Sequence, residues 1–169
     1  RNLWKNAIGN VSVEGGSDLE KTIFYTSLYH TMIDPRTFSD VNGNYIGADK
    51  KVHKTADFTY RSIFSGWDVF RSQFPLQTII NPDLVNDEIN SLLQMAELSG
   101  RDYLPRWEML NSYSGCMLGN PAVSVIVDAY EKGIRNYNIE KAFEYSKNSV
   151  DTFANNADGF TPHSISKTL

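Results

Sequence analysis

The positions of proline and of helix-capping residues constrain the fold of this chain most, because they divide it into short helices. Ser17-Asp18-Leu19-Glu20 is a capping box, in which a serine hydroxyl and a glutamate carboxylate satisfy exposed amides at a helix start. Asn81-Pro82 and Asn120-Pro121 each place proline at a first helical position, where its missing N–H costs nothing. The pattern predicts a mainly α-helical chain.

Five helices are expected, each from its apolar spacing and its start and stop residues. The first begins at Asp18 and ends by Pro35, and the second begins at Ser65-Gly66 and ends or kinks at Pro75. The third runs from Pro82 to Gly100, with its inner face formed by Val85, Ile89, Leu92, Leu93 and Ala96. The fourth runs from Ala122 to Lys132, and the fifth from about Asn138 to Phe153. The fourth is apolar nearly all round, so we expect it to be buried on most sides. In the fifth, Phe143 and Val150 are expected to face inward.

The segments Trp4 to Val13 and Phe38 to Val52 are expected to be extended, with Asn42-Gly43 as a turn signal. Two connections are long, Asp34 to Phe64 and Gly100 to Asn120. Loops of roughly 15 residues or more inside a domain are usually functional or mobile. These two connections are therefore the first places to look for a site.

Composition narrows the function classes. The chain has 169 residues, 41% of them hydrophobic and 12% aromatic, and a net charge of −4, which indicates one globular domain. Its longest basic cluster is Lys50-Lys51, so nucleic-acid binding has no electrostatic footprint. No apolar run approaches the ~18–20 residues of a membrane span. The single Cys116 excludes an internal disulfide framework, and the start at Arg1 suggests a piece of a longer protein.

Metal-binding patterns are weak. Asp40, Asn42 and Asn44 are spaced like the start of an EF-hand calcium loop, but the sixth and twelfth positions are Tyr45 and Lys51 instead of glycine and glutamate. A hairpin turn explains this segment better. The three histidines show no zinc-site spacing, and His30 is expected in the core or behind a site. No metal ligand is therefore assigned within this chain.

Glu108 is the candidate catalytic residue. It directly follows Trp107 in the long connection between two helices. A carboxyl group beside an indole is partly desolvated, which raises its pKa, and a raised pKa suits a general acid. On these local residues alone, a structural arrangement is favoured, in which Trp107 packs in a core and Glu108 caps the next segment.

Trp67-Asp68 repeats the pairing of an aromatic plane with a carboxylate at a helix–loop junction. Two such pairs favour a carbohydrate site, where the indole stacks on the sugar and the carboxylate binds its hydroxyls. Trp67 could instead anchor its own helix. His53-Lys54, in the other long connection, is a candidate hydrogen-bonding pair for the ligand, with a solvated surface as the alternative.

Taken together, the motifs resemble glycoside hydrolase family 92, the calcium-dependent exo-acting α-mannosidases. The resemblance runs in order through nearly the whole chain. Its main matches are Val13-Glu14-Gly15-Gly16, Thr22 to His30, Phe38 to Val41, Val52-His53-Lys54, Trp67-Asp68, Leu104-Pro105 with Trp107-Glu108, Gly115-Cys116-Met117, and Asp128-Ala129-Tyr130 with Lys132-Gly133.

The resemblance implies a fold of mainly α class, part of an (α/α)6 helical barrel with long loops and a short β-hairpin. Residues 1–169 would be a partial catalytic domain of a longer, periplasmic or secreted protein that also has a β-sandwich domain. Glu108 would be the general acid, with Trp67, Asp68, Trp107, His53 and Lys54 binding a mannose-containing glycan. The catalytic base and the calcium ligands would lie outside this chain.

A different class of function remains open. The same helices and aromatic–carboxylate pairs could belong to a non-catalytic helical module that binds glycans or serves as a scaffold. Another helical-barrel glycosidase would share the acid without requiring calcium or mannose.

Overall fold

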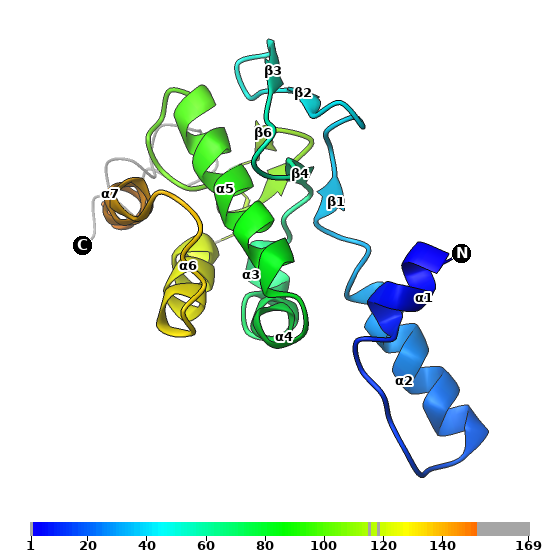
Figure 1. The fold of residues 1–169 in the computed structure, drawn as a ribbon. Coiled ribbons are helices and arrows are strands. Elements are labelled where there is room, and N and C mark those ends of the chain that lie inside the picture. The colour runs from blue at the N-terminus through cyan, green and yellow to red at the C-terminus, as the bar shows by residue number, and fades with distance from the viewer. Residues whose placement is uncertain (1, 115, 118, 152–169) are drawn as a thin grey trace.

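Helices dominate the residues that the computed structural model describes, which are 2–114, 116–117 and 119–151. These residues form seven helices and three two-stranded antiparallel pairs, so the expectation of a mainly helical chain is confirmed. Figure 1 shows α3 to α7 and the strands gathered in one body, with α1 and α2 standing to one side of it. The first long connection, residues 34–64, runs from the side of α2 to the top of that body in this view.

The N-terminal arm consists of α1 (Asn2–Ile8) and α2 (Asp18–His30). The capping box is present, since the Ser17 hydroxyl accepts from the Glu20 amide and the Glu20 carboxylate accepts from the Ser17 amide. The prediction that Trp4 to Val13 is extended is wrong for its first half, which is helical. Apolar side chains four residues apart, as in Trp4 and Ile8, share a helix face, and this local spacing outweighs the run's resemblance to a strand.

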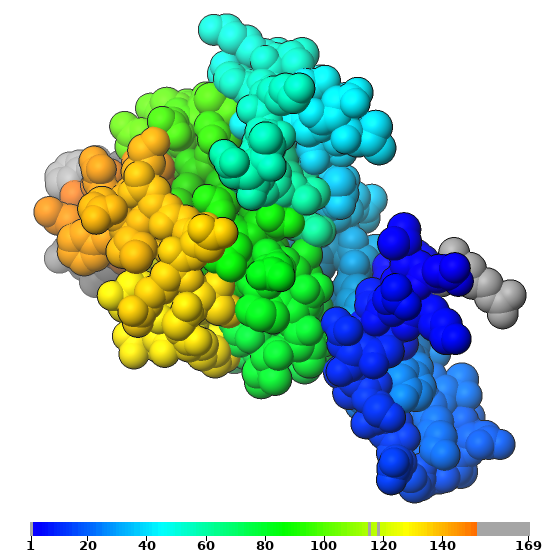
Figure 2. Space-filling view, in the orientation of Figure 1, coloured from blue at the N-terminus to red at the C-terminus, as the bar shows by residue number. Residues whose placement is uncertain are grey.

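Most of the apolar face of α2 is exposed. Leu19 is 69% exposed, and Leu28 is the buried residue of this helix. His30 is also exposed, so the expectation that it lies in the core is wrong. The arm is attached to the body by a hydrogen bond of 3.0 Å from the Gln77 amide to the Thr31 carbonyl. Figure 2 shows how far the arm projects from the body, which explains the exposure of its side chains.

The first long connection forms two strand pairs. β1 (Arg36–Thr37) pairs with β4 (Arg61–Ser62), and β2 (Asn44–Ile46) pairs with β3 (Val52–Lys54). The register joins Asn44 to Lys54 and Ile46 to Val52, so the hairpin loop is 47–51. The Asn42-Gly43 turn exists but lies before β2, and is therefore not the hairpin turn we expected.

Gly43 is required at that turn. Its φ of +80° is a backbone conformation that residues with a side chain rarely adopt. A Cβ atom there would lie 2.1 Å from the Thr55 carbonyl oxygen. The turn therefore brings residue 43 against Thr55, which directly follows β3.

The helix expected from Ser65 is short. α3 (Gly66–Val69) ends before Pro75, and α4 (Gln73–Ile80) begins afresh. Pro75 is thus in the first turn of α4 and neither ends nor kinks the preceding helix, contrary to the prediction. A proline in a first turn removes no intrahelical hydrogen bond, because that N–H has no partner within the helix.

α5 (Pro82–Leu98) is the central helix of the body and packs against α4, α6, α7 and β4. All five residues predicted for its apolar face are buried: Val85, Ile89, Leu92, Leu93 and Ala96. Fully burying one such aliphatic side chain contributes roughly 1.5–3 kcal/mol. No helix in the described part of the chain is long and apolar enough to cross a membrane.

α6 (Pro121–Glu131) and α7 (Ile139–Val150) complete the body. α6 buries one face only, since Val127 is half exposed, so the expectation of burial on most sides is wrong. In α7, Phe143 is 73% exposed and Val150 is 59% exposed, so neither faces inward as predicted. Ala142, Tyr145 and Ser149 form the packed face instead. Residues 152 and 153, the expected end of this helix, and His163 lie outside the described residues.

Candidate functional site

Glu108 lies in a tight hairpin within the second long connection. β5 (Glu108–Met109) pairs with β6 (Ser112–Tyr113), and Leu110 and Asn111 form the two-residue turn. Both turn residues have positive φ, 49° and 62°, as a type I′ hairpin requires. This short hairpin also forms a bridge with Phe64, which places Glu108 beside the end of β4.

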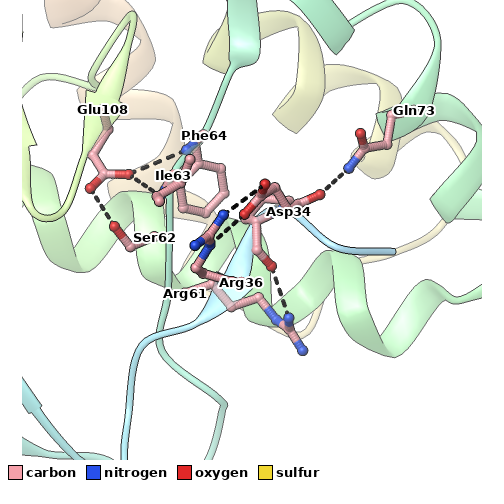
Figure 3. Close-up of polar contacts among 9 residues, drawn as sticks. Asp34, Arg36, Arg61, Ser62, Ile63, Phe64, Gln73 and Glu108 are labelled. Carbon is pink, nitrogen blue, oxygen red and sulfur yellow. Dashed lines mark hydrogen bonds and ion pairs between the residues drawn. The ribbon is translucent and has the colours of Figure 1, made fainter. Parts of the chain in front are cut away.

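The Glu108 carboxylate accepts four hydrogen bonds from the protein. The Ser62 hydroxyl donates to Oε1 at 2.7 Å, and the Ile63 and Phe64 amides donate to Oε2 at 2.7 and 3.3 Å (Figure 3). The Asn111 amide is the fourth donor, to Oε1. A carboxylate that accepts several hydrogen bonds is stabilised in its charged form.

Burial has the opposite effect on the pKa of Glu108 from that of those hydrogen-bond donors. Glu108 is 2% exposed, and burial raises the pKa of its carboxyl above the ordinary value although the Ser62 hydroxyl and the three amides lower it. The indole of Trp107 has a different role, because its Nε1 donates to Asp68 at 3.2 Å. Burial thus raises the pKa of Glu108, whereas the donors that lower it come from residues 62–64 and the hairpin turn, which lie far apart in sequence.

Ile63 has an unusual backbone conformation. Its φ is +67°, which is rare for a β-branched residue and costs of the order of 1–3 kcal/mol. This conformation directs two successive amides, those of Ile63 and Phe64, to the same carboxylate oxygen. Strain of this kind is found where the surrounding structure requires a particular geometry.

The two tryptophan–carboxylate pairs meet in space. Asp68 lies on the short helix α3 and Trp107 immediately precedes β5, and the hydrogen bond between them spans 39 positions of sequence. Trp67 is adjacent and substantially exposed. Trp67, Asp68 and Trp107 therefore form one surface cluster, whereas the carboxylate of Glu108 binds groups of β4 and the hairpin turn.

His53 is connected to Glu108 through stacked rings. Its Nε2 lies 2.9 Å from the Asp49 carboxylate, and its ring stacks on Tyr45, which stacks on Tyr60 at a centroid distance of 3.9 Å. The Tyr60 hydroxyl donates to the Asn111 side chain in the hairpin turn. Lys54 points elsewhere, since it is exposed and lines a surface depression with Asp40 and Asp87.

A cavity of about 270 Å³ lies beside Glu108. Its lining includes Lys50, Arg101, Tyr103, Asn111 and Tyr113. Sequence reasoning singled out none of these five as a site residue. The signal was present, because Arg101, Tyr103 and Tyr113 lie in the long connection from Gly100 to Asn120. None of the five expected sugar-binding residues is among the described residues that line this cavity.

A second buried carboxyl group was also missed. Glu88 on α5 is fully buried, and both of its oxygens are without a hydrogen-bond partner among the described residues. Burial raises the pKa of Glu88 to about 8, although Arg61 lowers it. Its position on the inner face of an amphipathic helix is the signal, because a carboxyl group at such a position must be paired or neutral.

The described residues do not fit a calcium site. They contain no group of three or more His, Cys, Asp or Glu side chains placed to hold a metal ion. The Asp40 carboxylate, the best sequence candidate, accepts hydrogen bonds from the Asn42 and Asn44 amides at 2.8 and 2.9 Å. These backbone bonds explain the Asp-Asn-Asn spacing as a turn motif.

Comparison with known proteins identifies the family. Residues 1–167 match the family model of the glycosyl hydrolase family 92 catalytic domain. No curated protein sequence matches the chain significantly.

Solved structures give the same result. The family GH92 α-mannosidase BT3965 from Bacteroides thetaiotaomicron is 32% identical, with a TM-score of 0.80 over 86% of this chain and 20% of its own. Its complex with mannoimidazole gives the same identity, TM-score and coverage of this chain, over 19% of its own. The GH92 family glycosyl hydrolase ccman5 is 26% identical, with a TM-score of 0.68 over 86% of this chain and 20% of its own. The chain thus spans about a fifth of these proteins. It belongs to glycosyl hydrolase family 92, within whose catalytic domain it falls.

Proposed function

We propose that the chain is part of the (α/α)6 catalytic domain of a longer, inverting α-mannosidase that removes terminal mannose from glycans. Membership of the family supports the hydrolase class, and the likeness to two α-mannosidase structures supports the substrate class. The seven helices are compatible with a segment of a helical barrel. The remaining segments of that domain and a β-sandwich domain are the proposed partners within the same protein.

Glu108 is the proposed general acid. The observation that carries this proposal is a buried carboxyl group with a raised pKa at the wall of a cavity. A carboxyl group with a raised pKa keeps its proton to higher pH than an ordinary glutamate, and it can transfer that proton to the glycosidic oxygen as the bond to the sugar breaks. A base outside this chain would take a proton from the attacking water, and inversion places the two carboxyl groups about 6.5–9.5 Å apart.

A structural role for Glu108 is the second candidate, and one observation favours it. Both oxygens already accept hydrogen bonds, three of them from backbone amides. Delivery of a proton requires one oxygen to leave its donors, and only the Ser62 hydroxyl can reverse its hydrogen bond. In this role, Glu108 would fasten the β5–β6 hairpin to residues 62–64 without touching substrate.

The proposed sugar-binding residues have unequal support. Exposed Trp67 and Asp68 form an aromatic and acidic cluster with the half-buried Trp107, which suits stacking on a sugar ring and hydrogen bonding to its hydroxyls. His53 is half-buried and held by Asp49, which suits a positioned donor. Lys54 has the weakest support, because it is exposed and lines a depression that does not include Glu108.

Calcium dependence is proposed from family membership, with ligands outside this chain. The described residues provide no site for the ion. A periplasmic or secreted location is likewise proposed from the family. A non-catalytic glycan-binding or scaffold module is the alternative for a chain of this kind.

The test is the activity of the full-length protein on α-mannobiosides, with calcium and with a chelator. We expect calcium-dependent hydrolysis in which β-mannose appears first, observed by proton NMR before mutarotation. Appearance of α-mannose first would contradict inversion. Binding of mannosides without hydrolysis would favour the non-catalytic module.

A further inference from the structure

The segment from Thr59 to Phe64 carries three of the four hydrogen-bond donors to Glu108. Those donors are the Ser62 hydroxyl and the amides of Ile63 and Phe64. Among the described residues, the segment pairs through the two-residue strands β4 and β1 and through the single bridge of Phe64 with Glu108, and it includes the strained Ile63. An isolated two-stranded pair is at best marginally stable. Other contacts must therefore hold the segment where Glu108 needs it.

Two side chains of α5 provide those contacts. The Asp87 carboxylate accepts from the Thr59 amide at 3.0 Å, and the Ser91 hydroxyl accepts from the Arg61 amide at 2.9 Å. The Ser91 hydroxyl in turn donates to the Asp87 carbonyl at 2.7 Å. Side chains of α5 thus accept hydrogen bonds from the backbone amides of Thr59 and Arg61 along one edge of the segment.

The spacing of these contacts matches the geometry of both elements. Asp87 and Ser91 are four residues apart and share one helix face, separated by about 6 Å along the axis. Thr59 and Arg61 are two residues apart, about 6–7 Å along an extended chain, with their amides on the same side. The two acceptors therefore meet the two amides in a single register.

The side chain of Arg61 strengthens this attachment. Its guanidinium donates to the Pro35 carbonyl at 3.0 Å (Figure 3), and its Nε lies 3.9 Å from the Asp87 carboxylate. The buried Glu88 carboxyl is also close enough to Arg61 for each to affect the other's pKa. The segment is thus held between α5 on one side and the chain before β1 on the other.

We infer that Asp87 and Ser91 are positioning residues for Glu108, acting through the backbone of residues 59–64. They set the place of the donors that fix the Glu108 carboxylate and stabilise its charged form. The consequence for catalysis rests on the proposed role of Glu108 as general acid, whereas the structural coupling does not.

The experiment uses the full-length protein with four variants of α5. Ser91→Ala removes one acceptor, Asp87→Ala removes the other, and Asp87→Asn keeps a carbonyl oxygen for the Thr59 amide while removing the charge. Asp83→Asn is the matched control, because Asp83 is exposed on the same helix. The measurements are kcat and KM on a poor leaving group, the pH profile and the melting temperature.

We expect Ser91→Ala and Asp87→Ala to lower kcat about ten- to a hundredfold, the usual effect of a small misplacement, with little change in KM. Displacement of residues 59–64 weakens the hydrogen bonds to the Glu108 carboxylate, which raises its pKa. The basic limb of the pH–rate profile should therefore move to higher pH. Asp87→Asn should move it less than Asp87→Ala, and Asp83→Asn should resemble the wild type. An unchanged kcat and basic limb, with only a lower melting temperature, would overturn the inference.

A double-mutant cycle separates this inference from the proposed function. If Glu108→Gln does not affect turnover, Glu108 is not the acid, and the cycle between Ser91→Ala and Glu108→Gln in unfolding free energy decides the inference alone. Residues without shared partners are additive within roughly 0.3–0.5 kcal/mol. Non-additivity supports coupling through residues 59–64, and additivity overturns it. If Ser91→Ala does not fold, Asp87→Ala replaces it in the cycle.

Discussion

The hydroxyl of Ser62 donates a hydrogen bond of 2.7 Å to the carboxylate of Glu108, 46 residues later in the chain. It joins the end of β4 to the start of the β5–β6 hairpin, and so unites the two long connections at one buried carboxyl group. Hydrogen bonds to charged groups contribute about 1.5–3 kcal/mol each, which makes this contact important for both geometry and protonation.

Glu108→Gln in the full-length protein tests the proposed acid. We expect the rate on substrates with poor leaving groups to fall by roughly 10²–10⁴-fold, because the amide cannot supply a proton. An activated aryl mannoside needs less protonation and should lose less activity. Equal losses on both substrates, accompanied by a lower melting temperature, would favour the structural role instead.

Ser62→Ala should raise the pKa of Glu108 further, because the hydrogen bond from the Ser62 hydroxyl lowers that pKa more than any other donor does. A general acid works in its protonated form, so the basic limb of the pH–rate profile should move to higher pH. Ser72→Ala is the control, since Ser72 is exposed and remote from the carboxyl group. A basic limb that stays in place would contradict this assignment.

Glu88 predicts a dependence of stability on pH. Its pKa in the folded chain is raised from 4.5 to about 8, so the folded state keeps a proton that the unfolded state has already lost. This stabilisation is complete below pH 4.5 and is lost as the pH rises through about 8. Glu88→Gln should therefore unfold at a higher temperature than the wild type at pH 8, but not at pH 4.5. The opposite result would show that Glu88 is ionised and paired with Arg61.

Asp68 and Trp107 should act together in binding sugar. Asp68→Ala is expected to reduce turnover with little change in melting temperature, because the side chain is exposed. Trp107→Phe removes the indole N–H that Asp68 accepts, so its effect should not add fully to that of Asp68→Ala. Normal activity in the folded fraction of either variant would leave this pair with a structural role only.

The 169-residue chain alone should associate and show no α-mannosidase activity, even with calcium, because it lacks the proposed base. Its exposed apolar side chains, such as Phe143 on α7, favour self-association. Light scattering should report oligomers, reduced by Phe143→Ser and not by Lys147→Ser on the same helix. Robust calcium-dependent hydrolysis by an intact monomer of this length would contradict the proposal that it is a partial domain.

Helix starts could be predicted from sequence because their signals are local. The Ser17 capping box provides hydrogen-bond partners for the free amides of the first turn, and Pro82 and Pro121 have no N–H that would need a partner there. The inner face of α5 follows from apolar spacing alone. Inward faces could not be predicted at Phe143 or Val150, because exposure depends on which neighbours are present.

For the candidate site as well, some features could be predicted from the sequence and others depend on the tertiary structure. The sequence by itself directed attention to the long connections 34–64 and 100–120, and to Glu108 as the carboxyl group to examine. Only the tertiary structure decided what surrounds it, because the Ser62 hydroxyl, the strained Ile63 amide and the α5 side chains Asp87 and Ser91 come from distant positions. A pKa depends on burial and on donors within a few ångströms, and those distances are set by folding.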